Sequence, residues 1–449
     1  MRNSSRGFGG GYGMKHLLET REAKTIIALL AAELGCLLLV TYKGLGSNYL
    51  PVTLMFMFFS VAGCIIAFSF QADSILTVLV LLLLNIGFMV QQIQFGSAMG
   101  AGSFLKKFTI VIAAALAAAF LYKFLADWLS REYMIVLMMI LQYLISLAMA
   151  VFAQSTGDKS GQGAAIELLG ITPFEIVKVL YIFVAAGLLC KKERERMRIL
   201  KWEIRREVVL ILHTIFLSLF FLLCSELGTF MIVYLTGLIL LWIYGKKRKL
   251  IWSLILLSAT GFVLVWALCG LLLYPMMLER QLALPGTVEK LISRFGTALH
   301  PEKSIASAGY QGTMGLEAIA IGGWLGIPSE RYRLELPEAA NDFAFANVVQ
   351  TCGLLIGFLL ILFMIAFIKR GMDIANRCSD GYFQGIAVSI SILFVTEAVV
   401  HIGYNTALLP ITGIPLYFIS QGFTAIFTGM TFVAILLVIS TGDMERTVE

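Results

Sequence analysis

The chain has 449 residues, of which 59% are hydrophobic and only 14% are charged. Its mean hydropathy of +0.88 excludes a soluble globular domain, and no basic stripe typical of nucleic-acid binding is present. The composition therefore predicts a polytopic membrane protein whose core is the helix bundle itself.

The seven cysteines and four histidines show no spacing typical of a disulfide framework or a metal site. The cysteines are therefore predicted to be buried thiols, and no metal ligand is assigned. Residues 1–23 are Gly-rich, polar and basic, and no clear small-residue cleavage site follows them. We therefore expect the first apolar stretch to be an uncleaved membrane helix.

About twelve apolar runs have the length of a bilayer-spanning helix, roughly 17–25 residues. They lie at 24–42, 51–70, 74–91, 107–126, 133–153, 173–190, 207–224, 227–244, 250–273, 343–368, 382–404 and 411–440. The last run is long and is interrupted by Gly413 and Pro415. The predicted fold is an all-α polytopic membrane protein with about 12 transmembrane helices.

Basic residues predict how these spans are oriented. Eight Lys and Arg residues lie between Lys191 and Arg206, four more form the run 246–249, and another group follows the tenth span. With twelve spans these loops share one side with the basic N-terminus, so both termini are predicted to be cytoplasmic. Lys106 and Lys107 are discordant, but one pair does not outweigh the other loops.

This topology places the polar segments 154–172 and 274–342 outside the membrane. A structureless loop as long as 274–342 is uncommon, and such segments are usually functional or partly ordered. It leads into the stretch RYRLELPEAANDFAF, which places Glu335, Glu338 and Asp342 beside the tenth span. Carboxylates beside a bilayer are costly unless they are solvated, paired or used. Taken alone, these three also fit ordinary loop charges near a helix start.

Four further features combine charge or helix breakers with apolar helix. Glu175 and Lys178 share one helix face at i,i+3, either as a self-neutralising ion pair or as a contact to a charged lipid headgroup. Glu226 fits a capped turn, and Arg294 is either solvated or a bidentate phosphate ligand. The breakers in 405–424 lie at membrane depth, where they kink a helix or line a cavity.

In their order along the chain, these features resemble the SEDS family (shape, elongation, division and sporulation), which includes FtsW, RodA and SpoVE. The family signatures PxTGIPLPFxSxGGS, QPSExxK, QPDLGT and LPExxTDFIFA are similar to PITGIPLYFISQGFT (410–424), ITPFEIVK (171–178), CSELGT (224–229) and LPEAANDFAFA (336–346). GYQ (309–311) and AIAIGGWLG (318–326) are similar to the family's outer-loop patches. The resemblance covers roughly 155–440 and is carried by several motifs in one order.

The resemblance implies a core of ten spans, so two spans at the N-terminus are additional. It divides the chain into a cytoplasmic tail, N-terminal helices that include the two extra spans, a SEDS-like core with its outer loop before span 10, and a second cytoplasmic tail. These parts are predicted at 1–23, 24–153, 154–440 (outer loop 274–342) and 441–449.

The resemblance also implies a peptidoglycan glycosyltransferase that polymerises lipid II at the outer face of the bacterial cytoplasmic membrane, in division, elongation or sporulation. Asp342 is then the candidate general base for the attacking sugar hydroxyl. The substrate-site residues that it implies are Glu175, Lys178, Arg294, Gln311, Glu338, Thr412 and Ser420. A divalent cation, Mg²⁺ or Mn²⁺, stays open as a cofactor for the pyrophosphate. The implied partner is a class B penicillin-binding protein, a transpeptidase.

The chain departs from the family signatures at several places. Asn341 stands for the Thr before the Asp, and Gln350-Thr351 stands for a Glu-Glu pair. Ala165-Ile166-Glu167 stands for an Arg-Arg-Trp, and Tyr417 stands for a proline. These departures indicate a divergent member, and they leave a non-catalytic scaffold for cell-wall synthesis as an alternative.

A lipid II flippase or transporter is the other alternative. Such a protein needs ionisable residues deep within several spans. The clearest ones here are Glu33, His213, Glu397 and His401.

Overall fold

The structure is a computed structural model. It describes residues 21–42, 46–95, 101–155, 172–190, 196–199, 202–224, 226–280, 286–299, 308–328 and 332–442. Both predicted tails, apart from a few residues, and most of the polar segment 154–172, including Ala165-Ile166-Glu167, lie outside these ranges.

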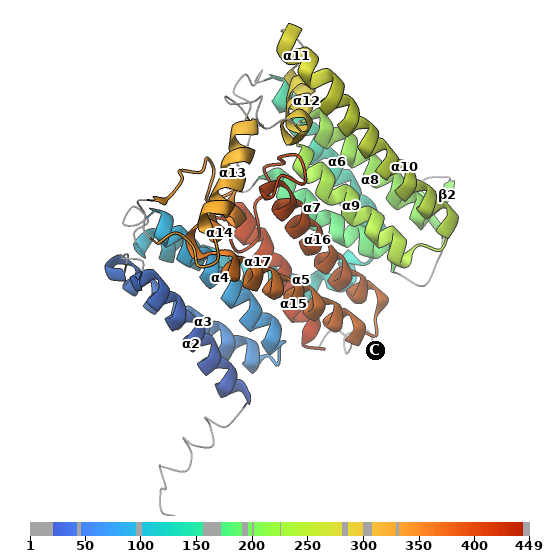
Figure 1. The fold of residues 1–449 in the computed structure, drawn as a ribbon. Helices are drawn as coiled ribbons and strands as arrows, with labels where there is room; N and C mark the ends of the chain where they lie inside the picture. The colour runs from blue at the N-terminus through green and yellow to red at the C-terminus, as the bar shows by residue number, and fades with distance from the viewer. Residues whose placement is uncertain are drawn as a thin grey trace, which may run out of the picture.

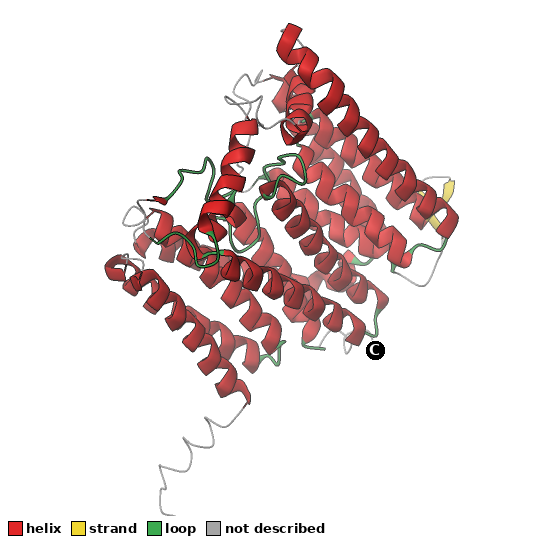
Figure 2. Ribbon diagram, in the orientation of Figure 1, coloured by secondary structure: helices red, strands yellow, loops and turns green. Residues whose placement is uncertain are grey.

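Almost all of the described chain is helical (Figure 2). In chain order the helices are α2 (Arg21–Tyr42), α3 (Gly46–Ser69), α4 (Ser74–Phe95), α5 (Ala101–Leu129), α6 (Glu132–Ser155), α7 (Pro173–Leu189), α8 (Arg206–Leu223), α9 (Leu227–Tyr244), α10 (Arg248–Ala267), the π-helix η2 (Leu268–Leu273), α11 (Tyr274–Arg280), α12 (Gly286–Leu299), α13 (Ala308–Gly322), α14 (Ala344–Cys352), α15 (Leu354–Arg377), α16 (Gly381–Asn405) and α17 (Phe423–Ser440). Strands β1 (Arg196–Ile199) and β2 (Trp202–Arg205) form an antiparallel hairpin between α7 and α8.

Among the described residues, 10 helices are long and apolar enough to cross a membrane, judged by length and composition. They coincide with ten of the predicted spans, and the all-α polytopic fold class is confirmed. The other two predicted spans correspond to α5 and to α7, which has 17 residues. The count of twelve spans is therefore not confirmed.

Two predicted spans have different boundaries in the structure. The run 343–368 is divided at Gly353 into α14 and α15, and the run 411–440 becomes helical only at Phe423. Gly353 has φ +91, and a Cβ there would lie 2.3 Å from the carbonyl oxygen of Trp324. The backbone of the 318–326 patch packs against this junction, where Leu354 N donates to Gly323 O over 2.8 Å. Because φ is positive and the two backbone segments are in close contact, only glycine, which has no side chain, fits this position without strain.

The predicted outer segment 274–342 contains α11, α12 and α13. Figure 1 shows α11 and α12 at one end of α10, with β2 near the other end. Tyr274 is buried against Gly296, where an added Cβ would lie 2.1 Å from the tyrosine ring. This contact fixes α12 on α11 and η2, and α12 carries Arg294.

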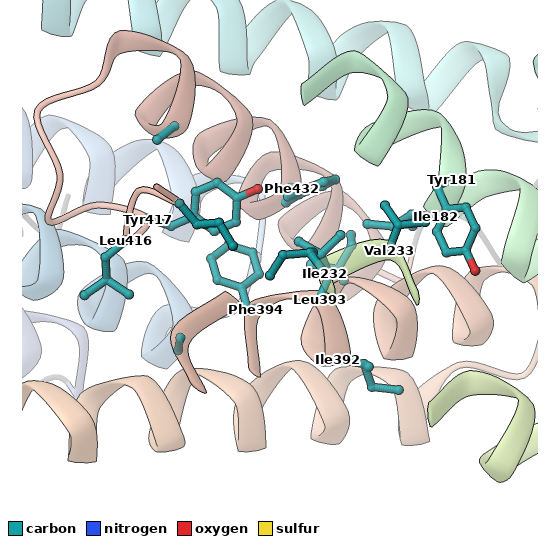
Figure 3. Packing of buried hydrophobic residues seen from close by; sticks show 14 of the residues in the cluster. Tyr181, Ile182, Ile232, Val233, Ile392, Leu393, Phe394, Leu416, Tyr417 and Phe432 are labelled. Atoms are coloured by element: carbon teal, nitrogen blue, oxygen red, sulfur yellow. The ribbon is translucent and has the colours of Figure 1, made fainter. Parts of the chain in front are cut away.

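Helix α16 forms the centre of the bundle and is buried along most of its length. Its Phe394 ring lies 4.5 Å from the Phe367 ring and 4.9 Å from the Tyr417 ring, measured between centroids. Figure 3 shows Phe394, Tyr417 and Phe432 gathered in this core, with Ile232 and Leu393 beside them. A closely packed core of this kind gives polar side chains inside it a fixed position.

The segment between α16 and α17, which we call the 406–422 loop, has no helix of its own although it lies inside the bundle. Non-helical backbone at membrane depth is tolerated only where protein or a cavity satisfies its polar groups. Gln91 Nε2 donates to Ile419 O over 2.8 Å, and a Cβ at Gly87 would lie 2.3 Å from Phe418 O. Helix α4 is therefore in backbone contact with the loop. The loop groups Leu416 N and Ser420 Oγ pair with each other over 2.8 Å.

Helices α2 and α3 form a hairpin that packs on α4 at the edge of the bundle (Figure 1). Glu33 of α2 is fully buried in the hairpin, and Ser60 Oγ of α3 donates to its Oε1. The other oxygen of Glu33 is buried with no hydrogen-bond partner among the described residues.

Candidate active site

Asp342 lies in a turn that ends directly before α14. The turn is built on Glu338, which has φ +50 and whose carbonyl oxygen accepts from the amides of Asn341 (3.0 Å) and Phe343 (3.1 Å). Phe343 is fully buried, whereas Asp342 is partly exposed. The buried Phe343 side chain therefore anchors the turn, and the carboxylate of the neighbouring Asp342 keeps access to solvent.

The last turn of α16 fixes the backbone of Asp342. The Tyr404 hydroxyl donates to Asp342 O over 2.7 Å, and Asn405 Nδ2 donates to the same oxygen over 3.0 Å. Asn405 Oδ1 accepts from Ala346 N over 3.0 Å, so one side chain spans the start of α14. Two donors on a rigid helix leave the position of Asp342 little freedom.

The 406–422 loop passes beside the Asp342 carboxylate. Gly413 has φ +70, and a Cβ at this position would lie 3.3 Å from Asp342 Oδ2. Any other residue would be strained here and would crowd the carboxylate. The neighbouring Thr412 is buried, and its hydroxyl has no hydrogen-bond partner among the described residues. On the other side of the turn, Ser420 Oγ donates to Asn341 O over 2.8 Å.

Charged groups from three further positions act on Asp342, and we call the four residues the outer charge cluster: Glu226, Arg294, Glu338 and Asp342. The pKa of Asp342 is raised from 3.8 to about 6 by burial and, to a smaller extent, by the charges of Glu338 and Glu226, while the charge of Arg294 acts in the opposite direction. Burial also lowers the pKa of Arg294, whose guanidinium nevertheless stays charged. Glu226 occupies the N-cap position of α9, but its side chain makes no capping hydrogen bond, so the interpretation as a simple capped turn is wrong.

Glu175 and Lys178 form the predicted ion pair, but they lie inside the bundle. Lys178 Nζ is 2.5 Å from Glu175 Oε1 and 3.3 Å from Glu397 Oε1, and it donates to the Tyr417 hydroxyl over 3.2 Å. The Tyr417 hydroxyl donates in turn to Glu175 Oε2 over 3.3 Å. Lys178 is 3% exposed and Glu397 is 1% exposed. We call these four residues the buried ion cluster.

The predicted substrate residues therefore separate into groups. Glu338 and Arg294 belong to the outer charge cluster, and Thr412 lies next to Gly413. Gln311 is partly exposed on α13, where the following residue, Gly312, faces Ile411 of the loop. Ser420 is fully buried and the pair Glu175–Lys178 is almost so, and in this state these side chains make their contacts within the protein. Their roles towards a substrate stay predictions.

The sequence assigns no site role to Glu397, Tyr417 or Tyr404, and it includes Asn405 only as part of the breaker segment 405–424. In sequence, Glu397 is an ionisable residue deep in a span, and Tyr417 is a departure from a signature. The separation of 219 residues between Lys178 and Glu397 leaves no local signal for their contact. Tyr404 and Asn405 end a span beside the loop, which is the one indication that they face it.

The ionisable residues that motivate a transporter already have partners within the protein. His213 lies 2.7 Å from the Tyr143 hydroxyl and 3.0 Å from Gln142 Oε1. His401 Nδ1 lies 2.7 Å from Ile414 O, so it also holds the 406–422 loop. Within the described ranges, no group of three His, Cys, Asp or Glu residues could hold a metal ion.

Comparisons with known proteins show the family to which the chain belongs. Residues 73–445 match the family model FtsW/RodA/SpoVE, described as cell cycle protein. Stage V sporulation protein E of Bacillus subtilis (strain 168) is 26% identical over 379 residues, which cover 82% of this chain and 96% of that protein. A probable peptidoglycan glycosyltransferase FtsW of Aliivibrio salmonicida is 30% identical over 66% of this chain and 70% of its own length.

A solved structure described as "Structural coordination of polymerization and crosslinking by a peptidoglycan synthase complex" contains a chain with the same fold. The TM-score is 0.55 at 19% sequence identity, and the match covers 83% of this chain and 98% of that chain. At this identity the likeness shows the fold alone. The helices α2 and α3 precede the residues that the family model matches.

Proposed function

Because the chain belongs to the FtsW/RodA/SpoVE family of cell cycle proteins, we propose that it is a peptidoglycan glycosyltransferase that uses Asp342 as its general base. The observation that carries the proposal is the environment of Asp342. A partly exposed carboxylate with a pKa of about 6 is acted on by the charge of Arg294. At neutral pH this group is mostly ionised, yet basic enough to accept a proton.

The substrate that fits this site is lipid II, a disaccharide-pentapeptide on undecaprenyl pyrophosphate. The acceptor sugar hydroxyl attacks the anomeric carbon of the donor, and Asp342 takes the hydroxyl proton. The bond from the anomeric carbon to the pyrophosphate oxygen breaks, and the lipid pyrophosphate leaves with the electron pair. Arg294, whose guanidinium stays charged and acts on Asp342, is the protein group suited to meet the leaving charge.

A divalent cation, Mg²⁺ or Mn²⁺, would supply further charge for the pyrophosphate. The described residues contain no group of three His, Cys, Asp or Glu that could hold such a cation, so the pyrophosphate itself would have to supply most of its ligands. Activity that survives EDTA would argue against a metal.

The partner that we propose is a class B penicillin-binding protein, a transpeptidase. The solved chain with this fold belongs to a complex whose description names both polymerisation and crosslinking. The location that we propose is the bacterial cytoplasmic membrane, with both termini cytoplasmic and the outer charge cluster outside. The basic loops around β1–β2 and at 246–249 support this orientation.

The decisive experiment is polymerisation of lipid II by the purified full-length chain, compared with Asp342→Asn. We expect a loss of at least about 100-fold without a lower melting temperature, because the variant removes a general base and a partly buried charge. Glu335→Gln is the matched control, since Glu335 is an exposed carboxylate in the same stretch. Undiminished polymerisation by Asp342→Asn would remove Asp342 from the mechanism. Lipid II crossing a membrane without polymer would instead support a flippase, and neither activity would support a scaffold.

A further inference from the structure

All three N–H donors of Lys178 have partners within the buried ion cluster. An ammonium group has three N–H donors, and its contacts are Glu175 Oε1 (2.5 Å), Glu397 Oε1 (3.3 Å) and the Tyr417 hydroxyl (3.2 Å). The Tyr417 hydroxyl closes the ring by donating to Glu175 Oε2. An incoming anion would have to displace one of these partners from a buried site, at high cost. In this state Lys178 is therefore occupied by the protein itself.

Tyr417 is the member of the cluster that belongs to the 406–422 loop. Four residues before it, Gly413 lies beside the Asp342 carboxylate. Three and four residues after it, Ser420 Oγ donates to Asn341 O over 2.8 Å and Gln421 N donates to Ala340 O over 2.8 Å. The loop thus contacts the Asp342 turn on both sides, and Tyr417 is one of the residues that anchor it between these contacts, together with Ile414 and Ile419.

The residue type at position 417 also bears on the loop's rigidity. The similar family signature has a proline here, which would fix φ and limit the conformations of the chain. Tyrosine has no such restriction, and the next residue, Phe418, has a positive φ of +68. The hydrogen bonds of the Tyr417 hydroxyl, together with its ring packing on Phe394 and Phe432, supply the restraint in another form.

We propose that Tyr417 and Glu397 are positioning residues for Asp342. Glu397 holds Lys178 from α16, Lys178 and Glu175 hold the Tyr417 hydroxyl, and Tyr417 holds the loop that borders the Asp342 carboxylate. The catalytic part of this inference rests on the proposed function, whereas the structural part does not. Neither residue touches the reacting atoms.

The test compares Tyr417→Phe and Glu397→Gln with the wild-type chain. Tyr417→Phe removes only the hydroxyl, and Glu397→Gln keeps the shape but weakens the hold on Lys178. Tyr382→Phe is the matched control, because its hydroxyl is buried on α16 without a hydrogen-bond partner among the described residues. All variants are studied as full-length chains in the same detergent or lipid.

The first measurement is amide hydrogen exchange over 338–346 and 406–422, which needs no enzymatic activity. We expect Tyr417→Phe to exchange faster than wild type in both segments, and Tyr382→Phe to match wild type. Unchanged exchange in Tyr417→Phe would overturn the proposal, whatever the activity. Faster exchange in a protein that never polymerises lipid II would uphold the positioning of the loop and refute the proposed function.

The second measurement is lipid II polymerisation as a function of pH. We expect kcat to fall about tenfold in Tyr417→Phe with little change in KM, because misplacing a reacting group by about 1 Å costs up to about 100-fold. The low-pH limb of the pH–activity profile should move to lower pH. A looser loop exposes Asp342 to water and so lowers its pKa, while the charges of Glu226, Glu338 and Arg294 still act on it. Tyr417→Pro, which introduces the residue of the signature, should recover part of kcat. Wild-type kcat and an unmoved limb in Tyr417→Phe would overturn the proposal.

Discussion

The buried ion cluster and the outer charge cluster contain similar residues in opposite circumstances. In the first, Lys178 donates to three partners and is 3% exposed. In the second, three carboxylates share one arginine, and Asp342 remains partly exposed beside a glycine. The comparison indicates that ion pairs enclosed by the protein hold the helices in place, whereas a carboxylate that keeps access to solvent remains available for chemistry.

The largest effect that we expect from this comparison is on stability. Lys178→Met would leave Glu175 and Glu397 buried without their cation, at a cost of about 3–5 kcal/mol in the free energy of unfolding. The measurement is the melting temperature of the purified variant, with Lys249→Met as the control for an exposed lysine. A Lys178→Met protein as stable as wild type would show that the cluster does not hold the fold, and the comparison would fail.

The next effect concerns the outer charge cluster and should fall on activity alone. Arg294→Lys keeps the positive charge but loses the planar fork that contacts two phosphate oxygens. We expect polymerisation to fall about tenfold to 100-fold, as for the loss of a charge-assisted hydrogen bond, with an unchanged melting temperature. Kinetics at saturating lipid II will measure this. Equal losses of activity and stability would instead place Arg294 among the structural charges.

The smallest effect is on pH dependence. Asp342 must be ionised to act as a base, so activity should be lost as the pH falls through about 6. Glu338 raises this pKa, so Glu338→Gln should move the low-pH limb towards lower pH. Because Glu338 is exposed, the shift should be a fraction of a pH unit and should shrink at high salt. A low-pH limb that moves to higher pH would contradict the assignment of Glu338 as a charge that raises the pKa of Asp342.

The sequence predicts the helices of this protein well, because apolar runs of bilayer length allow few other structures. It misses the break at Gly353, and although it marks interruptions at Gly413 and Pro415, it begins the last helix before Phe423. These boundaries depend on backbone contacts with distant segments, namely the patch around Gly323 and helix α4. Asp342 stands out in sequence because its motif is local. The contact of Lys178 with Glu397 joins residues far apart in the chain, and a periodic pattern contains no information about it.

The α2–α3 hairpin has a consequence for membrane topology. It adds two candidate spans before the residues that the family model matches, and an even number of added crossings leaves the sidedness of everything downstream unaltered. Two spans can therefore be added at the N-terminus without reversing the orientation of the rest of the protein in the membrane. A reporter protein fused before α2 and one fused before α4 should consequently read out the same compartment, whichever side that is.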